Sequence, residues 1–393
     1  MKENLSQAYD KYYKIILVLP IALLLISLGY LANFYFVNGD IMKKDVSLTG
    51  GTSVTIYDEK INVADLEKVL SEKLNDPSIT KLSDITTGKT VGVTIETQSG
   101  ENDTVTIIEN YLGYKLDSKN SDIEFSGSTL SSGFYFQLLQ SILLAFVLMS
   151  FVVFFLFGTS NQTKAFAAIL SFAAAKLTFP NVSVISVSSI ILCFAAIVAA
   201  FYFSKSKKEY IISAILTILA IFVFFFSSYY LMIIIIPILI IIYISYSIPS
   251  MAVISCAFAD IVMTLFFVDL IGLKVSTAGI IAFLMLIGYS VDSDMLLTTR
   301  LTKRSTGFGS NNSRIFGAFK TGMTMTLTSI AAVVIGYLIS RSFSDVLSQI
   351  FLILAIGLIL DIFNTWITNA SLLKWYVEHK EKNNSSEVIQ NAS

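Results

Sequence analysis

Apolar runs of 18 or more residues recur along this chain from Ile15 to Leu373. A run of that length with few charges is long enough for an α-helix to cross a bilayer. Of the 393 residues, 54% are hydrophobic and 14% are charged, whereas an average soluble domain has about 25% charged residues. The first run, which ends near Phe36, is longer than the apolar part of a signal peptide and lacks a small-residue cleavage site, so we expect an uncleaved anchor. The sequence therefore predicts a polytopic α-helical membrane protein.

Polar and apolar stretches alternate and divide the chain into segments. Ten membrane helices are predicted, near 15–36, 134–158, 162–179, 184–203, 210–227, 229–248, 250–268, 276–297, 320–340 and 345–373. We interpret the remaining parts as a cytoplasmic N-terminus (1–14), an extracytoplasmic α+β domain (37–133) and a cytoplasmic tail (374–393). This topology places most Lys and Arg of the short loops in the cytoplasm, as the positive-inside rule requires.

The polar segment 37–133 is the one part that reads as a water-soluble domain. It begins with a strand-like run containing Gly50 and Gly51, which predict a tight bend or bulge. A helix pattern follows, with Asn62 as its N-cap, and then two strands, a second helix and a last strand. The order β-α-β-β-α-β predicts a ferredoxin-like sandwich.

Several functions are disfavoured by the composition. The formal net charge of −1 gives no basic face for a nucleic acid. Cys193 and Cys256 both lie in apolar runs, and the only histidine, His379, lies in the tail. We therefore expect no cofactor, no metal site and no enzymatic activity.

Four aspartates interrupt the last apolar runs, at Asp260, Asp292, Asp294 and Asp361. An acid within a membrane helix is costly and usually functional. Desolvation and mutual repulsion favour the protonated form, which suits reversible protonation, so these residues are candidates for a proton relay. The alternative is that each is a buried structural group that only makes hydrogen bonds.

Asp292 and Asp294 point about 200° apart on a helix, so they cannot share one face. Ser290 shares a face with Asp294, and Gly288 shares one with Asp292. We favour Asp292 as the acid that faces the polar interior, because it lies deeper and Gly288 would let a neighbouring helix approach closely.

A row of threonines opens the span at 320–340. Thr321, Thr324 and Thr328 recur at i, i+3 and i+7, which puts them near one helix face. Their hydroxyls could line a proton path, and ordinary helix packing is the alternative.

Six stretches together resemble SecF, the partner of SecD within the resistance-nodulation-division superfamily, with the archaeal branch most similar. They are "LTGGTSVTI" (48–56), "IEFSGSTLSSGFYFQ" (123–137), "IPSMAVISCAFADIV" (248–262), "LIGYSVDSDMLLTTRLTKR" (286–304), "TGMTMTLTS" (321–329) and "DIFNTWITNASLL" (361–373). The resemblance implies an RND-type helical bundle with one small external domain. It also implies that residues 159–248, with four extra helices, are an insertion, which would be either lipid-facing scaffold or a docking surface.

The resemblance implies assistance to protein export in the cell membrane, together with a SecD-like subunit, a SecY-type translocon, a translocating unfolded polypeptide and membrane lipids. In bacterial members export uses proton flow, which points to Asp260 and the acid of the "GYSVDSD" motif. The external-domain motif is Gly50, Gly51 and Thr52. The bacterial acid aligns with Ser293, and a bacterial arginine aligns with Thr321, beside Lys320.

Three other interpretations remain open at this point. A small-molecule or lipid exporter of the same superfamily would have a similar bundle, and an assembly subunit of the translocase would move no protons. An intramembrane aspartyl protease is disfavoured, because its Gly-x-Gly-Asp element is absent from the sequence.

Overall fold

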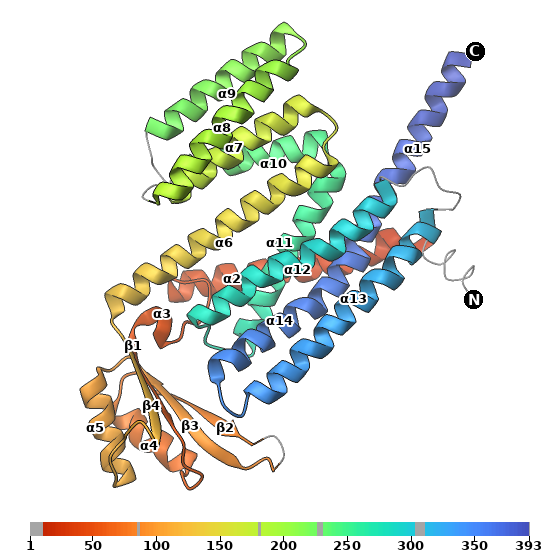
Figure 1. Cartoon of the computed structure of the whole chain (residues 1–393). Helices are drawn as coiled ribbons and strands as arrows, with labels where there is room; N and C mark the ends of the chain where they lie inside the picture. The colour runs from red at the N-terminus through yellow and green to blue at the C-terminus, as the bar shows by residue number, and fades with distance from the viewer. Residues whose placement is uncertain (1–10, 85–86, 180–181, 226–230, 303–310, 393) are drawn as a thin grey trace.

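A computed structural model describes residues 11–84, 87–179, 182–225, 231–302 and 311–392. Long helices form a bundle, and a small α+β domain lies at one end of it (Figure 1). Within the described residues, seven helices are long and apolar enough to cross a membrane. They are Lys11–Asn38, Ser128–Phe157, Val184–Phe203, Ile248–Leu270, Thr277–Thr302, Asn311–Ser340 and Asp345–Lys382. The predicted multi-pass helical fold with one small α+β domain is confirmed.

The α+β domain has the predicted β-α-β-β-α-β order. Its elements are β1 (Gly51–Ile56), α4 (Val63–Lys73), β2 (Ser78–Ser83), β3 (Thr90–Thr97), α5 (Glu101–Leu112) and β4 (Ser121–Ser126). The strands pair antiparallel in the order β2-β3-β1-β4, which is the ferredoxin-like arrangement. Val54, Ile56, Val93 and Ile95 are fully buried with side chains of α4 and α5, because alternate strand residues face the same side of a sheet.

The glycine pair joins this domain to the bundle. Gly50 follows the short helix α3 (Val46–Thr49) and has φ +86°, and Gly51 begins β1 with φ +143°. A Cβ on Gly50 would lie 2.4 Å from Cα of Ser128, and one on Gly51 would lie 2.2 Å from the carbonyl oxygen of Thr97. Thr52 is buried and donates to the carbonyl of Ser99 at 2.8 Å. The Gly-Gly-Thr motif thus has a structural reason, since no larger residue fits the bend.

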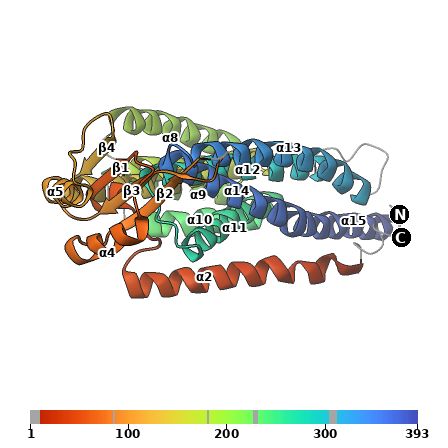
Figure 2. The same cartoon turned by 90° about the horizontal axis from the view of Figure 1, so that it is seen from below.

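The main bundle consists of α2 (Val18–Asn38), α6 (Ser128–Phe157), α11 (Ile248–Leu270), α12 (Thr277–Thr302), α13 (Asn311–Ser340) and α14 (Asp345–Phe363). After α14 the chain continues through a π-helix, η2 (Asn364–Asn369), into α15 (Ala370–Ala392). Helices α11, α12 and α14 pack against one another. The beginning of α2 and the end of α15 lie at the end of the bundle far from the α+β domain in both views (Figure 1 and Figure 2).

The described residues between 159 and 247 form four helices, α7 (Asn161–Thr178), α8 (Ser183–Phe203), α9 (Lys207–Phe225) and α10 (Met232–Tyr246). Helix α7 packs against α6, α8, α9 and α10, and most of its side chains are buried. Of these four helices, α8 is one of the seven candidate membrane spans. Helix α10 is apolar but shorter than a candidate span. That all four cross the membrane stays a prediction.

Candidate functional site: a buried acidic cluster

Three aspartates from three helices meet inside the bundle. Asp260 comes from α11, Asp294 from α12 and Asp361 from α14, and each has at most 1% of its surface exposed. Within the part of the chain that the structure describes, no ion pair involves them, and no group of His, Cys, Asp and Glu could hold a metal ion. Carboxylates this deeply buried repel one another strongly, so the three are not expected to be ionised together.

Asp260 is held by one donor from each of two neighbouring segments. Ser290 of α12 donates to Oδ2 at 2.5 Å, and Asn364 of η2 donates its Nδ2 hydrogen to Oδ1 at 2.6 Å. All three residues are completely buried. Ser290 therefore forms a hydrogen bond with Asp260 on α11. The sequence had predicted only that Ser290 shares a helix face with Asp294.

A threonine hydroxyl connects the other two acids. Thr365 Oγ1 lies 3.0 Å from Oδ1 of Asp294 and 3.1 Å from Oδ1 of Asp361. Ser293 also donates to Asp361, at 2.9 and 3.0 Å to its two oxygens, and Asn369 donates to Asp294 Oδ1 at 2.7 Å. A hydroxyl carries a single hydrogen, so Thr365 bonds to one acid at a time as donor. Oδ2 of Asp294 is buried and has no hydrogen-bond partner among the described residues.

The π-helix η2 supplies three of these partners, Asn364, Thr365 and Asn369, all completely buried. A π-helix is wider than an α-helix and is frequent at functional sites. These three residues are not among those predicted from the sequence. The spacing of Asp361, Thr365 and Asn369 (i, i+4, i+8) was the available signal, because it puts three polar groups along one face of an apolar helix.

Comparisons with known proteins place this cluster in a family context. A family model described as protein export membrane protein SecD/SecF, C-terminal, matches residues 222–379, which include all three acids. This region is therefore similar to the C-terminal part of SecD and SecF proteins. The predicted resemblance to SecF is thereby confirmed.

Individual relatives agree with the family model. SecF of Methanolacinia petrolearia is 49% identical over 142 residues, which are 35% of this chain and 49% of that protein. SecF of Methanocaldococcus jannaschii is 45% identical over 149 residues, covering 37% and 52% respectively. The chain thus spans about half the length of the curated relatives it matches. A crystal structure of SecDF, a translocon-associated membrane protein from Thermus thermophilus, matches 94% of this chain and 38% of its own, with TM-score 0.51 and 12% identity, which shows a common fold.

Asp292 of the SecF-like motif does not face the cluster, and the preference for it over Asp294 is wrong. Asp292 is exposed, and Gly288 on the same face is exposed too. A Cβ at Gly288 would meet no atom within 4 Å, so no helix approaches there. The buried stripe of α12 contains Ser290, Ser293 and Asp294. Depth along the helix favoured Asp292, but the rotation of the helix about its axis decides which acid is inside.

The threonine row also lies away from the cluster. Thr321, Thr324 and Thr328 are exposed, as is Lys320. Each threonine hydroxyl bonds to a backbone carbonyl of α13 itself, at 3.2, 2.8 and 2.7 Å. The arrangement does not place this row on a path to the three acids.

Proposed function

We propose that this chain is a SecF-like subunit of the protein-export machinery. It would act with a SecD-like subunit and a SecY-type translocon on an unfolded polypeptide that crosses the membrane. The observation that carries the proposal is the buried cluster of Asp260, Asp294 and Asp361 within the region that matches the SecD/SecF family model. Relatives that are similar to about a third of this chain carry the name protein-export membrane protein SecF.

The proton gradient would be used by reversible protonation of the cluster. In this mechanism Asp294 accepts a proton on Oδ2, which has no other partner among the described residues. Rotation of the Asp294 carboxyl brings that proton to Thr365, whose oxygen accepts it while its hydroxyl gives its own proton to Asp361, because Thr365 lies within hydrogen-bonding distance of Oδ1 of both acids. The Ser293 hydroxyl, which has one hydrogen, lies within hydrogen-bonding distance of Asp361 and of the backbone carbonyl of Ser290, and the side chain of Ser290 donates to Asp260. Protonation changes which groups donate, and so changes how α11, α12 and α14 bind one another.

The topology we propose puts the ends of the chain in the cytoplasm and residues 37–133 outside. Support comes from the charges at the bundle end far from the α+β domain, where Arg300 lies in the last turn of α12 and Arg314 and Lys320 lie in the first turns of α13. Basic residues favour the cytoplasmic side of a membrane protein.

A face of α12 and α13 supports a partner within the membrane. The two helices run side by side in opposite directions (Figure 1), and Arg300 donates to Thr321 at 3.0 Å. Asp292 lies about 12 Å along α12 from Arg300, and Thr328 lies about 10 Å along α13 from Thr321, so both are at a similar depth. Lipid tails do not satisfy an exposed aspartate at that depth. We propose that a SecD-like subunit covers this face.

Asparagine substitutions separate the roles of the acids. Asp294→Asn and Asp361→Asn are made in the full chain, and export of a secreted reporter is measured with and without a proton gradient. We expect both variants to lose the stimulation by the gradient and to keep the basal export. Asp122→Asn is the control, because this acid is exposed on β4, away from the cluster and from the face of α12 and α13, and it should keep the stimulation.

Two results would redirect the proposal. Full stimulation in both buried variants would mean that the cluster moves no protons and that the chain acts as an assembly subunit. Failure of the chain to copurify with a SecD-like subunit, together with transport of a small molecule by the chain alone, would favour an exporter.

A further inference from the structure

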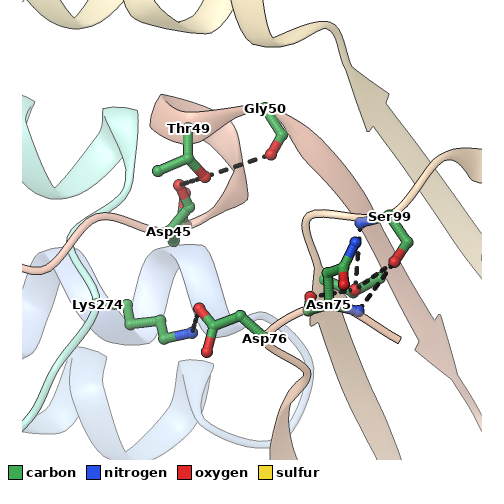
Figure 3. A network of polar contacts seen from close by, with 8 residues as sticks. Asp45, Thr49, Gly50, Asn75, Asp76, Ser99 and Lys274 are labelled. Atoms are coloured by element: carbon green, nitrogen blue, oxygen red, sulfur yellow. Dashed lines mark hydrogen bonds and ion pairs between the residues drawn. The ribbon is translucent and has the colours of Figure 1, made fainter. Parts of the chain in front are cut away.

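The α+β domain meets the membrane helices at a junction rich in acids. We call this junction the joint and define it by Asp45, Asp76, Glu96, Lys274 and Asp345. Asp45 is the N-cap of α3, Asp76 follows α4, Glu96 lies on β3, Lys274 precedes α12 and Asp345 begins α14. Lys274 Nζ lies 3.3 Å from Oδ2 of Asp76, and Figure 3 shows this pair close to Asp45. Four carboxyl groups from four segments thus gather around one lysine.

The membrane side of the joint is firmly built. The backbone N–H of Asp45 donates to the carbonyl of Val275 at 3.1 Å, and the N–H of Val275 donates to the carbonyl of Lys43 at 2.7 Å. Gln349 of α14 accepts from the N–H of Ser276 at 2.9 Å and donates to the carbonyl of Lys274 at 2.5 Å. The segment before α3 and the first turns of α12 and α14 are therefore bonded to one another.

The domain side of the joint is a polar face of the sheet. Val93 and Ile95 point to α4 and α5, so Thr94 and Glu96 point to the opposite face. A polar sheet face would ordinarily be exposed, yet Thr94 is 6% exposed and Glu96 is half-buried. Asp345 of α14 lies beside Thr94. The first turn of α14 therefore covers this part of the sheet.

Glu96 is the titratable group of this interface on β3. Burial above all, together with the nearby carboxyls of Asp45 and Asp345 and against the opposing charge of Lys274, raises the pKa of Glu96 to about 7. Burial also raises the pKa of Asp45. On the neighbouring strands, Glu96 lies opposite Ser53 of β1 and Ser78 of β2, and Glu124 of β4 lies beyond Ser53 on the same row.

We propose that this joint is a pH-dependent contact, in which the α+β domain packs on the ends of α12 and α14 while Glu96 is protonated and loosens when Glu96 ionises. The two chain connections, at Gly50–Gly51 and at Gly127, lie side by side, since Gly50 packs on Ser128. They form one hinge between the domain and the bundle. The inference goes beyond the proposed export function, and it requires neither export nor the buried cluster.

The sign follows from linkage. An acid with a raised pKa in the packed state stabilises that state fully below its ordinary pKa of 4.5, and this stability is lost as the pH rises through about 7. The difference between the ordinary pKa of 4.5 and the pKa of about 7 in the packed state changes the equilibrium between packed and loosened domain by at most about 300-fold. Screening by solvent at the half-buried Glu96 reduces this factor.

Distance measurements between two spin labels test the proposal. The full chain in lipid nanodiscs carries Asn110→Cys on α5 and Leu270→Cys at the end of α11, both exposed positions. The native Cys193 and Cys256 are buried, so we expect the spin label to react with them slowly. We expect a narrow distance distribution at pH 5 that becomes broad at pH 9, with a midpoint near pH 7. A distribution that stays unchanged between pH 5 and pH 9 would overturn the proposal.

Variants then test Glu96 itself. Glu96→Gln should keep the narrow distribution at every pH, and the matched control Glu124→Gln, on the same row but on the exposed edge strand, should behave like the unaltered chain. Persistence of the transition in Glu96→Gln contradicts the proposal. Should that variant misfold, Asp45→Asn serves instead: asparagine keeps the N-cap and removes a charge that repels ionised Glu96. The packed state should then persist to higher pH, so the midpoint should move upward. An unmoved midpoint then contradicts the proposal in the same way.

Discussion

Replacing Thr365 by valine tests the connection between two of the buried acids. Valine has nearly the same shape as threonine, so Thr365→Val creates no cavity and removes the hydroxyl alone. That hydroxyl lies 3.0 Å from Asp294 and 3.1 Å from Asp361, and all three residues are buried. A buried acceptor that loses its donor costs about 1–3 kcal/mol. Each acid keeps another donor, from Asn369 or Ser293, so we expect a loss of stability at the lower end of that range.

The effect on export should be larger than the effect on stability. A positioned group that transfers protons contributes about 100-fold or more to a rate, so the part of export that depends on the gradient should fall at least about tenfold. Two measurements on the full chain check this: a thermal melt in nanodiscs, and reporter export with and without the gradient. Thr368→Val is the matched control, because Thr368 lies in the same π-helix and makes only a 3.5 Å contact to Asn364. Undiminished gradient dependence in a folded Thr365→Val variant would refute the proposed path.

Two further predictions concern the α+β domain, and hydrogen exchange of its strands in the full chain measures both. Gly51→Ala should destabilise the domain by about 3 kcal/mol or more, because strain at positive φ costs about 1–3 kcal/mol and the Cβ would also collide with Thr97. Gly88→Ala is the control, since Gly88 has φ +66° but no neighbouring atoms near its Cβ position, and it should cost less. Equal costs for the two variants would contradict the packing argument. The N–H of Lys60 and the hydroxyl of Tyr114 lower the pKa of Asp58, so its contribution is present above pH 3.8 and is lost as the pH falls through the lower folded value. Asp58→Asn should flatten that acid limb of the stability profile, and an unaltered limb would show that other groups cause it.

The α+β domain was predictable because its pattern is local. Alternating apolar residues in β1 and β3 and the helical spacing of Leu66 and Leu70 determine which side chains meet in the core. Six elements in the order β-α-β-β-α-β then allow few antiparallel sheets. The bend at Gly50 and Gly51 could also be read from the sequence, because few other residues adopt those φ values.

The orientation of the membrane helices was harder to predict. The two acids of α12, Asp292 and Asp294, point to different sides of the helix, so the sequence gives little sign of which face is buried. The choice between Asp292 and Asp294 depends on a rotation of the helix that packing against α11 and α14 determines. The sequence also does not tell whether the threonine row of α13 faces the bundle interior or the lipid, because threonines are tolerated on either face. The π-helix could not be foreseen, since its wider turn is a response to tertiary packing.

Ser293 lies where the resemblance to SecF predicts an acid in the bacterial proteins. It is buried here and lies within hydrogen-bonding distance of both oxygens of Asp361. A carboxyl at this position would place a second negative charge beside Asp361, with no cation paired to either in the described part of the chain. A serine removes that repulsion and supplies a donor, while Asp294, one residue further along α12, provides the acid on the same buried stripe. Ser293→Asp should therefore raise the number of protons that the cluster holds rather than add a negative charge to it.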